Sequence, residues 1–165
     1  MELEALRRAT TGLRSAMYDL RHEKERPFVK AVKSLVELNR QLTPERKIGL
    51  IIERDFPEEL PGEANVELLR VLQEALANVR RHSGASNVEV RLRKGSGGEE
   101  VLAEVADDGR GFDRGSVRAG VGLSAMRERV EGLGGKIEVG SRPGEGTKVR
   151  VRVPLEGGTR APRRL

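Results

Sequence analysis

The chain has 165 residues, which is enough for one domain with a sizeable core and a tight fit for two, and no apolar run approaches the roughly 18 residues of a membrane span. The absence of cysteine excludes disulfides, thiol catalysis and cysteine-based metal sites, and two histidines are too few for a histidine-rich one. A net charge of +5 favours a nucleic-acid partner, but residues 55–113 carry 13 acidic and 7 basic side chains. Because the most distinctive residues, Glu74, Asn78 and Asp107, lie in that acidic region, we expect no direct nucleic-acid binding. Without a secretory or membrane segment we expect a cytoplasmic chain.

The N-terminal part of the chain is predicted to be mainly helical. Apolar side chains recur at helical spacing over residues 2–22 and again over residues 29–42, where Thr43-Pro44 stops the second helix. Residues 49–55 are predicted to form a short strand, which leads into a proline-bracketed loop.

Helices and paired strands alternate in the rest of the chain. A strongly periodic helix begins at Asn65 and is closed by Ser83-Gly84. The later predicted elements are a hairpin of strands 87–93 and 101–106, a helix over 123–133, a hairpin of strands 137–139 and 148–153, and a frayed tail over 156–165. Paired strands with helices between them predict an α+β fold, with helices on one face of a mixed sheet.

Three polar residues of the helix that begins at Asn65 are spaced four apart. Glu74, Asn78 and His82 therefore lie along one stripe of that helix. A carboxylate and a carboxamide oxygen one turn apart suit a hard cation that keeps most of its waters, as Mg²⁺ bound to a nucleotide does. The alternative is a solvated polar stripe without a ligand.

The run Asp107-Asp108-Gly109-Arg110-Gly111-Phe112 directly follows a predicted strand. A carboxylate at a strand end can accept a hydrogen bond from an exocyclic amine, and glycines let the backbone approach a flat ring closely. The alternative is an ordinary Asp-Gly turn.

Glycines recur at two further turns. Gly120-Val121-Gly122-Leu123-Ser124 opens a helix, where backbone amides free of side-chain obstruction can bind phosphate. Gly144-Glu145-Gly146-Thr147 enters the last predicted strand, where the Thr147 hydroxyl can lie beside Asp107. Each motif alone is equally consistent with a turn.

In this order the motifs resemble the ATP-binding catalytic domain of sensor histidine kinases, in the wider group that includes DNA gyrase B, Hsp90 and MutL. The resemblance covers roughly residues 60–155 and implies the Bergerat-type ATP-binding fold. This is a two-layer α/β sandwich whose mixed, mostly antiparallel sheet is covered on one face by helices and preceded by a helical segment. The expected division is a helical lead-in over 1–45, resembling the end of a dimerisation helix, a catalytic domain over 46–156 and a disordered basic tail over 157–165.

The resemblance also assigns roles to individual residues. It implies that Asn78 ligates Mg²⁺ and that Glu74 orients the metal waters or assists as a base. Asp107 would bind the adenine amino group of ATP. The remaining nucleotide contacts that it implies are Arg81 and His82 near the phosphates, Gly109, Gly111 and Thr147 at the adenine end, and Gly120, Val121, Gly122 and Leu123 at the phosphate-binding helix start, with residues 113–119 as a short lid.

The runs Gln73-Glu74-Ala75-Leu76-Ala77-Asn78 and Met126-Arg127-Glu128-Arg129-Val130 resemble most closely the subfamily that pairs with helix-turn-helix response regulators of the nitrate-sensor type. Such a kinase presents the γ-phosphate to a phosphoacceptor histidine on a dimerisation helix. His22 lies where this subfamily ends its second dimerisation helix, so we expect the acceptor to be absent from this chain and autophosphorylation with it. Residues 1–25 then offer a homodimer contact, and the chain could be the cytoplasmic part of a membrane-bound sensor.

Two other functions remain open at this stage. One is an anti-sigma-factor-type serine kinase of the same fold. The other is a non-enzymatic basic module for nucleic-acid binding or dimerisation, built on the positively charged regions 1–54 and 114–165.

Overall fold

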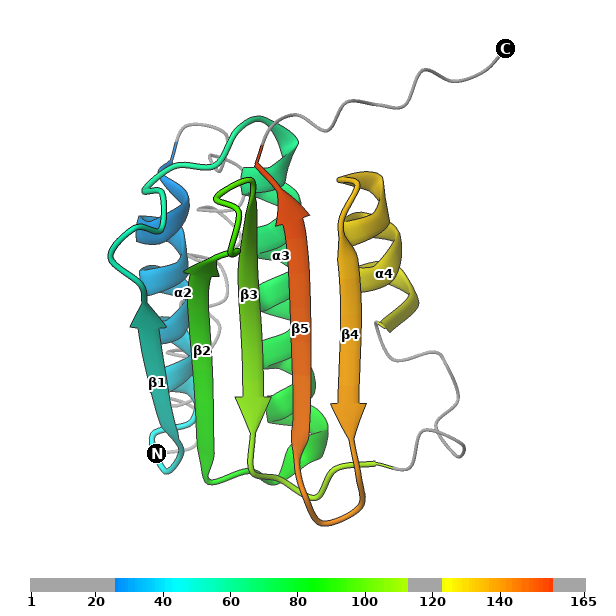
Figure 1. Ribbon diagram of the computed structural model, residues 1–165. Helices are drawn as coiled ribbons and strands as arrows, with labels where there is room; N and C mark the ends of the chain where they lie inside the picture. The colour runs from blue at the N-terminus through cyan, green and yellow to red at the C-terminus, as the bar shows by residue number, and fades with distance from the viewer. Residues whose placement is uncertain (1–25, 113–122, 156–165) are drawn as a thin grey trace.

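The computed structural model describes residues 26–112 and 123–155, and Figure 1 shows how its elements are arranged. Along the chain they are α2 (Phe28–Leu42), β1 (Lys47–Ile52), α3 (Glu63–Asn78), the π-helical turn η1 (Val79–Ser83), β2 (Asn87–Lys94), β3 (Glu100–Asp107), α4 (Leu123–Gly132), β4 (Lys136–Ser141) and β5 (Thr147–Pro154). The predicted helix over 2–22 and the predicted tail lie outside the described residues. Among the described helices, none is long and apolar enough to cross a lipid bilayer.

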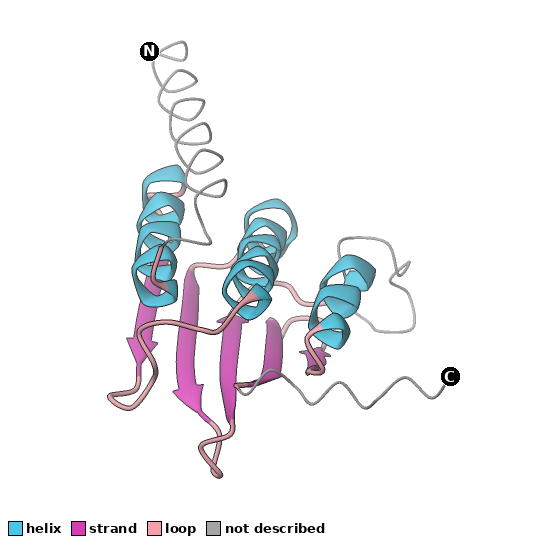
Figure 2. Ribbon diagram, turned by 90° about the horizontal axis from the view of Figure 1, so that it is seen from above, coloured by secondary structure: helices cyan, strands magenta, loops and turns pink. Residues whose placement is uncertain are grey.

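The five strands form one mixed sheet in the order β1-β2-β3-β5-β4. β1 runs parallel to β2, and the three other neighbouring pairs are antiparallel. Both predicted hairpins, β2–β3 and β4–β5, are confirmed. Figure 2 shows α2, α3 and α4 side by side on one face of the sheet, which confirms the predicted α+β architecture of two layers.

The hydrophobic core lies between the helical layer and the sheet. Successive side chains of a strand point to opposite faces, so the alternating pattern of β2 turns Val88, Val90 and Leu92 into the core. α3 contributes a stripe of leucines at helical spacing, which includes Leu68, Leu72 and Leu76.

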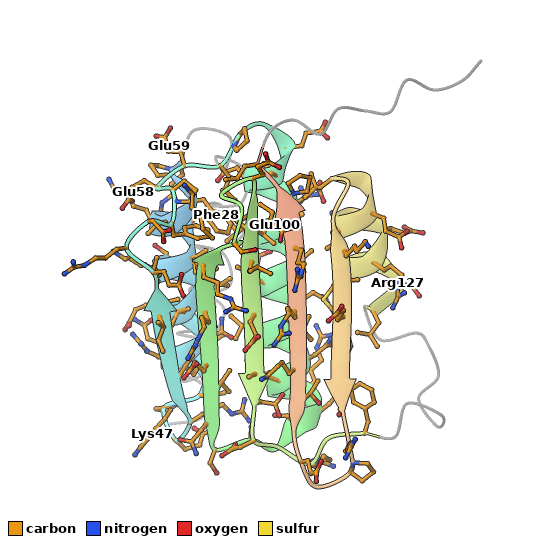
Figure 3. All side chains as sticks on the ribbon, viewed as in Figure 1. Phe28, Lys47, Glu58, Glu59, Glu100 and Arg127 are labelled. Atoms are coloured by element: carbon orange, nitrogen blue, oxygen red, sulfur yellow. The ribbon has the colours of Figure 1, made fainter. Side chains whose placement is uncertain are left out.

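An aromatic contact holds the N-terminal end of α2. Phe28, labelled in Figure 3, is fully buried, and its ring centroid lies 5.9 Å from that of Phe56. The backbone N–H of Val29 donates to the carbonyl oxygen of Glu58 at 3.2 Å. The loop between β1 and α3 is therefore fixed against α2.

The open face of the sheet carries charged side chains in ion pairs. Across the β3–β5 ladder, Arg150 Nε lies 3.0 Å from Glu104 Oε2, and Arg152 Nη1 lies 3.5 Å from Glu100 Oε1. Glu100 is labelled in Figure 3. Partly exposed pairs of this kind contribute little stability, but they keep the open face polar.

Several element boundaries differ from those predicted, most clearly both ends of β1 and the start of α3. β1 begins at Lys47 rather than at residue 49, because the backbone N–H of Lys47 donates to the carbonyl oxygen of Ser86 at 2.8 Å. It ends at Ile52 rather than at residue 55, because the chain turns there and the N–H of Phe56 bonds the carbonyl oxygen of Glu53 at 3.0 Å. α3 begins at Glu63, two residues before the predicted start.

Candidate functional site

Three segments that are distant in the sequence meet at one end of the sheet, the lower end in Figure 1. They are the end of α3 with η1, the loop that follows β3 and the turn between β4 and β5. The N–H of Arg110 donates to the carbonyl oxygen of Ser83 at 2.8 Å, which joins the first segment to the second. The N–H of Gly144 donates to the carbonyl oxygen of Arg110 at 2.6 Å, which joins the second to the third. Most of the predicted site residues lie on these segments.

The π-turn changes the predicted arrangement along α3. Glu74 and Asn78 remain one helical turn apart, but the chain passes from α-helix to π-helix directly after Asn78. A π-turn contains more residues than an α-helical turn, so the residues after Asn78 are rotated relative to the stripe that four-residue spacing predicts. As a result, Arg81 Nη1 lies 3.9 Å from Glu74 Oε1, while His82 is exposed on the same turn.

Side-chain hydrogen bonds and a left-handed glycine end this turn. Ser83 is buried, and its Oγ donates to the carbonyl oxygen of Val79 at 2.8 Å and accepts the N–H of Ala85 at 3.0 Å. Gly84 follows with a φ of 60°, the conformation that commonly ends a helix. Ser83-Gly84 is therefore the helix end that the sequence predicts.

Asp107 is the last residue of β3 and lies opposite Thr147, the first residue of β5. Its side chain is half-buried, and its Oδ1 accepts the N–H of Gly109 at 2.8 Å. Burial raises the pKa of Asp107 above the usual value of an aspartate, against the opposing effect of the backbone N–H groups of Gly109 and Thr147. Thr147 Oγ1 lies 2.9 Å from Ser141 Oγ. A carboxylate and a hydroxyl thus lie at neighbouring strand ends, as predicted.

The adjacent Asp108 has a different role, which the sequence reasoning missed. Its Oδ1 accepts the N–H groups of Ser86 and Asn87, both at 2.9 Å, and its Oδ2 accepts Asn87 Nδ2 at 2.7 Å. These bonds lower the pKa of Asp108, with the Asn87 side chain as the largest cause. Asp108 therefore ties the loop after β3 to the start of β2, while Asp107 faces the helical layer.

The glycines of the loop after β3 pack against the backbone of the other two segments. A Cβ atom on Gly109 would collide with the carbonyl oxygen of Ser83, and one on Gly111 would collide with the carbonyl oxygen of Arg142. Gly111 also has a φ of +62°, which other residues rarely adopt. The space that a side chain would fill at Gly109 and Gly111 is occupied by the backbone of neighbouring segments. The two glycines therefore shape this end of the site by allowing its loops to pack closely against one another.

A groove of about 440 Å³ runs along the outer side of the helical layer, next to Glu74. It is lined by residues of α2, α3, η1 and α4, namely Leu35, Leu38, Asn39, Leu42, Arg70, Gln73, Glu74, Ala77, Arg80, Ala125, Met126 and Arg129. Glu74 lies on the wall of the groove, whereas Asp107 lies at the strand ends outside it. Glu74 and Asp107 thus lie in different parts of the site.

Part of the predicted site falls outside the described residues. This part consists of Gly120, Val121 and Gly122, the predicted lid over 113–119, and His22. Leu123, the last residue of the predicted phosphate-binding motif, begins α4 and packs against the core.

The residues at the end of α3 fit a magnesium ion that is bound together with phosphates. Glu74 and Asn78 supply a carboxylate and a carboxamide oxygen one helical turn apart, and Mg²⁺ prefers oxygen donors. Within ranges 26–112 and 123–155, no group of three or more His, Asp or Glu side chains could hold a metal ion by itself. The donor set therefore suits an ion that takes few protein ligands and completes its shell with phosphate and water, as nucleotide-bound Mg²⁺ does.

Known proteins of one family match this chain. The family model described as histidine kinase-, DNA gyrase B-, and HSP90-like ATPase matches residues 63–157. The sensor histidine kinase LiaS of Bacillus subtilis is 45% identical over 89 residues, which cover 53% of this chain and 24% of LiaS. The histidine-protein kinase/phosphatase DegS of Brevibacillus brevis is 33% identical over 99 residues, covering 59% of this chain and 25% of DegS. This chain thus spans about a quarter of the length of these relatives.

Solved structures of histidine kinases share the fold. The histidine kinase domain of the Erythrobacter litoralis EL346 blue-light activated kinase has a TM-score of 0.63 at 23% identity, over 78% of this chain and 61% of that one. The mycobacterial sensor histidine kinase MprB has a TM-score of 0.63 at 19% identity, over 78% of this chain and 94% of that one. Since the family model covers more than half of the sequence and the same fold recurs, this chain belongs to the histidine kinase-, DNA gyrase B- and HSP90-like ATPase family.

Proposed function

We propose that this chain is the ATP-binding kinase domain of a two-component sensor histidine kinase of the nitrate-sensor-type subfamily, acting in the cytoplasm. The observation that carries the proposal is that the segments of Asn78 and Asp107 meet at one end of the sheet, where the Arg110–Ser83 hydrogen bond joins them. The resemblance to histidine kinases implies that the motif of Asn78 binds the metal and that the motif of Asp107 binds the adenine base. The similarity to LiaS and DegS supports the same function.

The adenine end of the site rests on Asp107. Its carboxylate, half-buried at the end of β3, would accept a hydrogen bond from the amino group of adenine. Gly109 N–H already bonds Oδ1 and so orients the carboxylate, which leaves its remaining acceptor positions for the base. Thr147 stands opposite on β5 and would complete the polar edge of this pocket.

The phosphate end of the site rests on the end of α3. Asn78 would hold Mg²⁺ through its side-chain oxygen, and the ion would neutralise negative charge on the phosphates. Glu74 would orient water or take a proton one turn before Asn78, and Arg81 and His82 would face phosphate. The amides of Gly120, Val121, Gly122 and Leu123 would bind phosphate oxygens at the start of α4.

Phosphoryl transfer asks a protein mainly for positioning and charge stabilisation. The domain would present the γ-phosphate to a phosphoacceptor histidine on a dimerisation helix, which would approach through the groove beside Glu74. The phosphoryl group would then pass to a helix-turn-helix response regulator. Residues 1–25 would contribute to dimerisation.

Titration calorimetry of the full chain with Mg-ATP tests the proposed function. We expect saturable binding of one ATP per chain that weakens when the metal is removed with EDTA. The same preparation would be titrated with duplex DNA at two salt concentrations. DNA binding that weakens with salt, in a chain that does not bind ATP, would overturn the proposal.

A further inference from the structure

A buried asparagine of α2 contacts the metal-binding end of α3. Asn39 is 1% exposed, and its Nδ2 donates to the carbonyl oxygen of Leu35 at 2.8 Å. Its Oδ1 accepts a hydrogen bond from Arg80 Nη1. A buried carboxamide is costly unless its polar atoms are paired, and these two contacts pair both the donor and the acceptor of Asn39.

The charged guanidinium of Arg80 lies in a partly buried position, where it loses some of its solvation. It lies in η1, two residues after Asn78, and it is only partly exposed at the wall of the groove. Burial lowers its pKa, and the neighbouring charges of Arg81 and Arg46 act in the same direction. A fixed acceptor such as Asn39 Oδ1 therefore decides on which side of the turn the Arg80 side chain lies.

The contacts of successive side chains define the rotation of η1. Val79 is buried in the core, Arg80 contacts α2, Arg81 lies 3.9 Å from Glu74, and Ser83 bonds back to Val79. If Arg80 were released from α2, the turn would lose one of the contacts that oppose its rotation about the helix axis, and the one that ties it to α2. Asn78 is the residue from which this turn begins, so the loss would reach the proposed ligand of the metal.

We propose that Asn39 is a positioning residue for the phosphate end of the nucleotide site, because it holds η1, through Arg80, in the orientation that presents Asn78 and Arg81. The inference rests on the proposed function. The inference adds a residue from α2, outside the nucleotide-binding motifs. It also predicts unequal effects at the two ends of the site, because the Asp107 carboxylate is held by the backbone N–H of Gly109 and not by a residue of α2 or η1.

The test compares Mg-ATP with adenosine, which has the base but no phosphates. Asn39→Ala should lower the affinity of the full chain for Mg-ATP about tenfold, by the size of one buried hydrogen bond to a charged group, and change the affinity for adenosine less than about twofold. Glu37→Gln, on the exposed side of the same helix, is the matched control and should change neither affinity. Equal loss for both ligands, or no loss for Mg-ATP, would overturn the proposal.

Two more variants separate positioning from packing. Asn39→Asp keeps an oxygen acceptor for Arg80 but loses the donor to Leu35, so it should restore Mg-ATP affinity to within about threefold of the unmodified chain. If it binds as weakly as Asn39→Ala, the Leu35 contact is what matters and the proposal fails. Should Asn39→Ala not fold, Arg80→Gln decides, with the same expected split between the two ligands. An unmodified chain that does not bind Mg-ATP would instead refute the proposed function.

Discussion

The backbone N–H of Arg110 donates a 2.8 Å hydrogen bond to the carbonyl oxygen of Ser83 and joins the loop after β3 to the end of η1. The Ser83 side chain stabilises the same corner, since its Oγ bonds both Val79 and Ala85. The position of the proposed adenine-binding loop relative to the proposed metal-binding helix thus depends on one buried serine.

Ser83→Ala should destabilise the protein by about 1–2 kcal/mol, because it removes an acceptor for the N–H of Ala85 in a buried setting. The measurement is urea unfolding of both proteins at neutral pH. Ser86→Ala is the control, because Ser86 is exposed and bonds Asp108 through its backbone N–H, which the substitution keeps. It should shift stability by less than about 0.5 kcal/mol. Equal effects of the two substitutions would contradict the role given to Ser83.

Asp107→Asn should weaken ATP binding by about 1.5–3 kcal/mol and reduce the preference for ATP over GTP, since a carboxylate that accepts from an amine is replaced by a neutral group. Competition titration with both nucleotides measures the change. Glu104→Gln alters a carboxylate of the same strand that pairs with Arg150 on the open face of the sheet, and it should leave both affinities unchanged. An unaltered ATP preference in Asp107→Asn would rule out the adenine contact.

Asn78→Ala should lower the affinity for ATP at least about tenfold in Mg²⁺ and much less in EDTA, since the side chain is expected to act through the metal. Calorimetry under both conditions gives the comparison. Arg70→Gln, an exposed change in the same helix, should leave the ratio of the two affinities unchanged. If Asn78→Ala weakened binding equally with and without Mg²⁺, Asn78 would not be a metal ligand.

The alternating and helical patterns predicted the elements because each has one face against the core. The same periodicity separates the two aspartates. Val101, Ala103 and Val105 are buried, so Asp107 continues the face that meets the helices while Asp108 turns away from it. The π-turn could not be predicted in this way, since it depends on contacts between distant residues such as Arg80 with Asn39. The extension of β1 to Lys47 has a similar cause, because it is made by the backbone of Ser86 rather than by an apolar side chain.

Asp108 should contribute stability that depends on pH. Its pKa in the folded protein lies below the usual 3.8, so its contribution is fully present above that value and is lost as the pH falls through the lower, folded pKa. Asp108→Asn should therefore lower the free energy of unfolding by up to about 1 kcal/mol at pH 7, a small amount because the group is exposed and screened. The difference in this free energy between the variant and the unmodified protein should become smaller in strong acid. Urea unfolding at a series of pH values checks this. If the difference in free energy of unfolding between the two proteins stayed constant down to strong acid, the charge of Asp108 would contribute nothing to stability.

Incubation of the full chain with labelled ATP and Mg²⁺ should leave no acid-labile phosphate on it. We expect this because His22 occupies the end of the predicted dimerisation helix rather than the position of a phosphoacceptor, although it lies outside the described residues. His22→Gln should accordingly behave like the unmodified chain, both in this assay and in ATP binding. The decisive observation is site mapping by mass spectrometry under conditions that preserve phosphohistidine. A phosphohistidine at His22 that disappears in His22→Gln would show that the chain carries its own acceptor, and the separate acceptor helix in the proposed function would then be unnecessary.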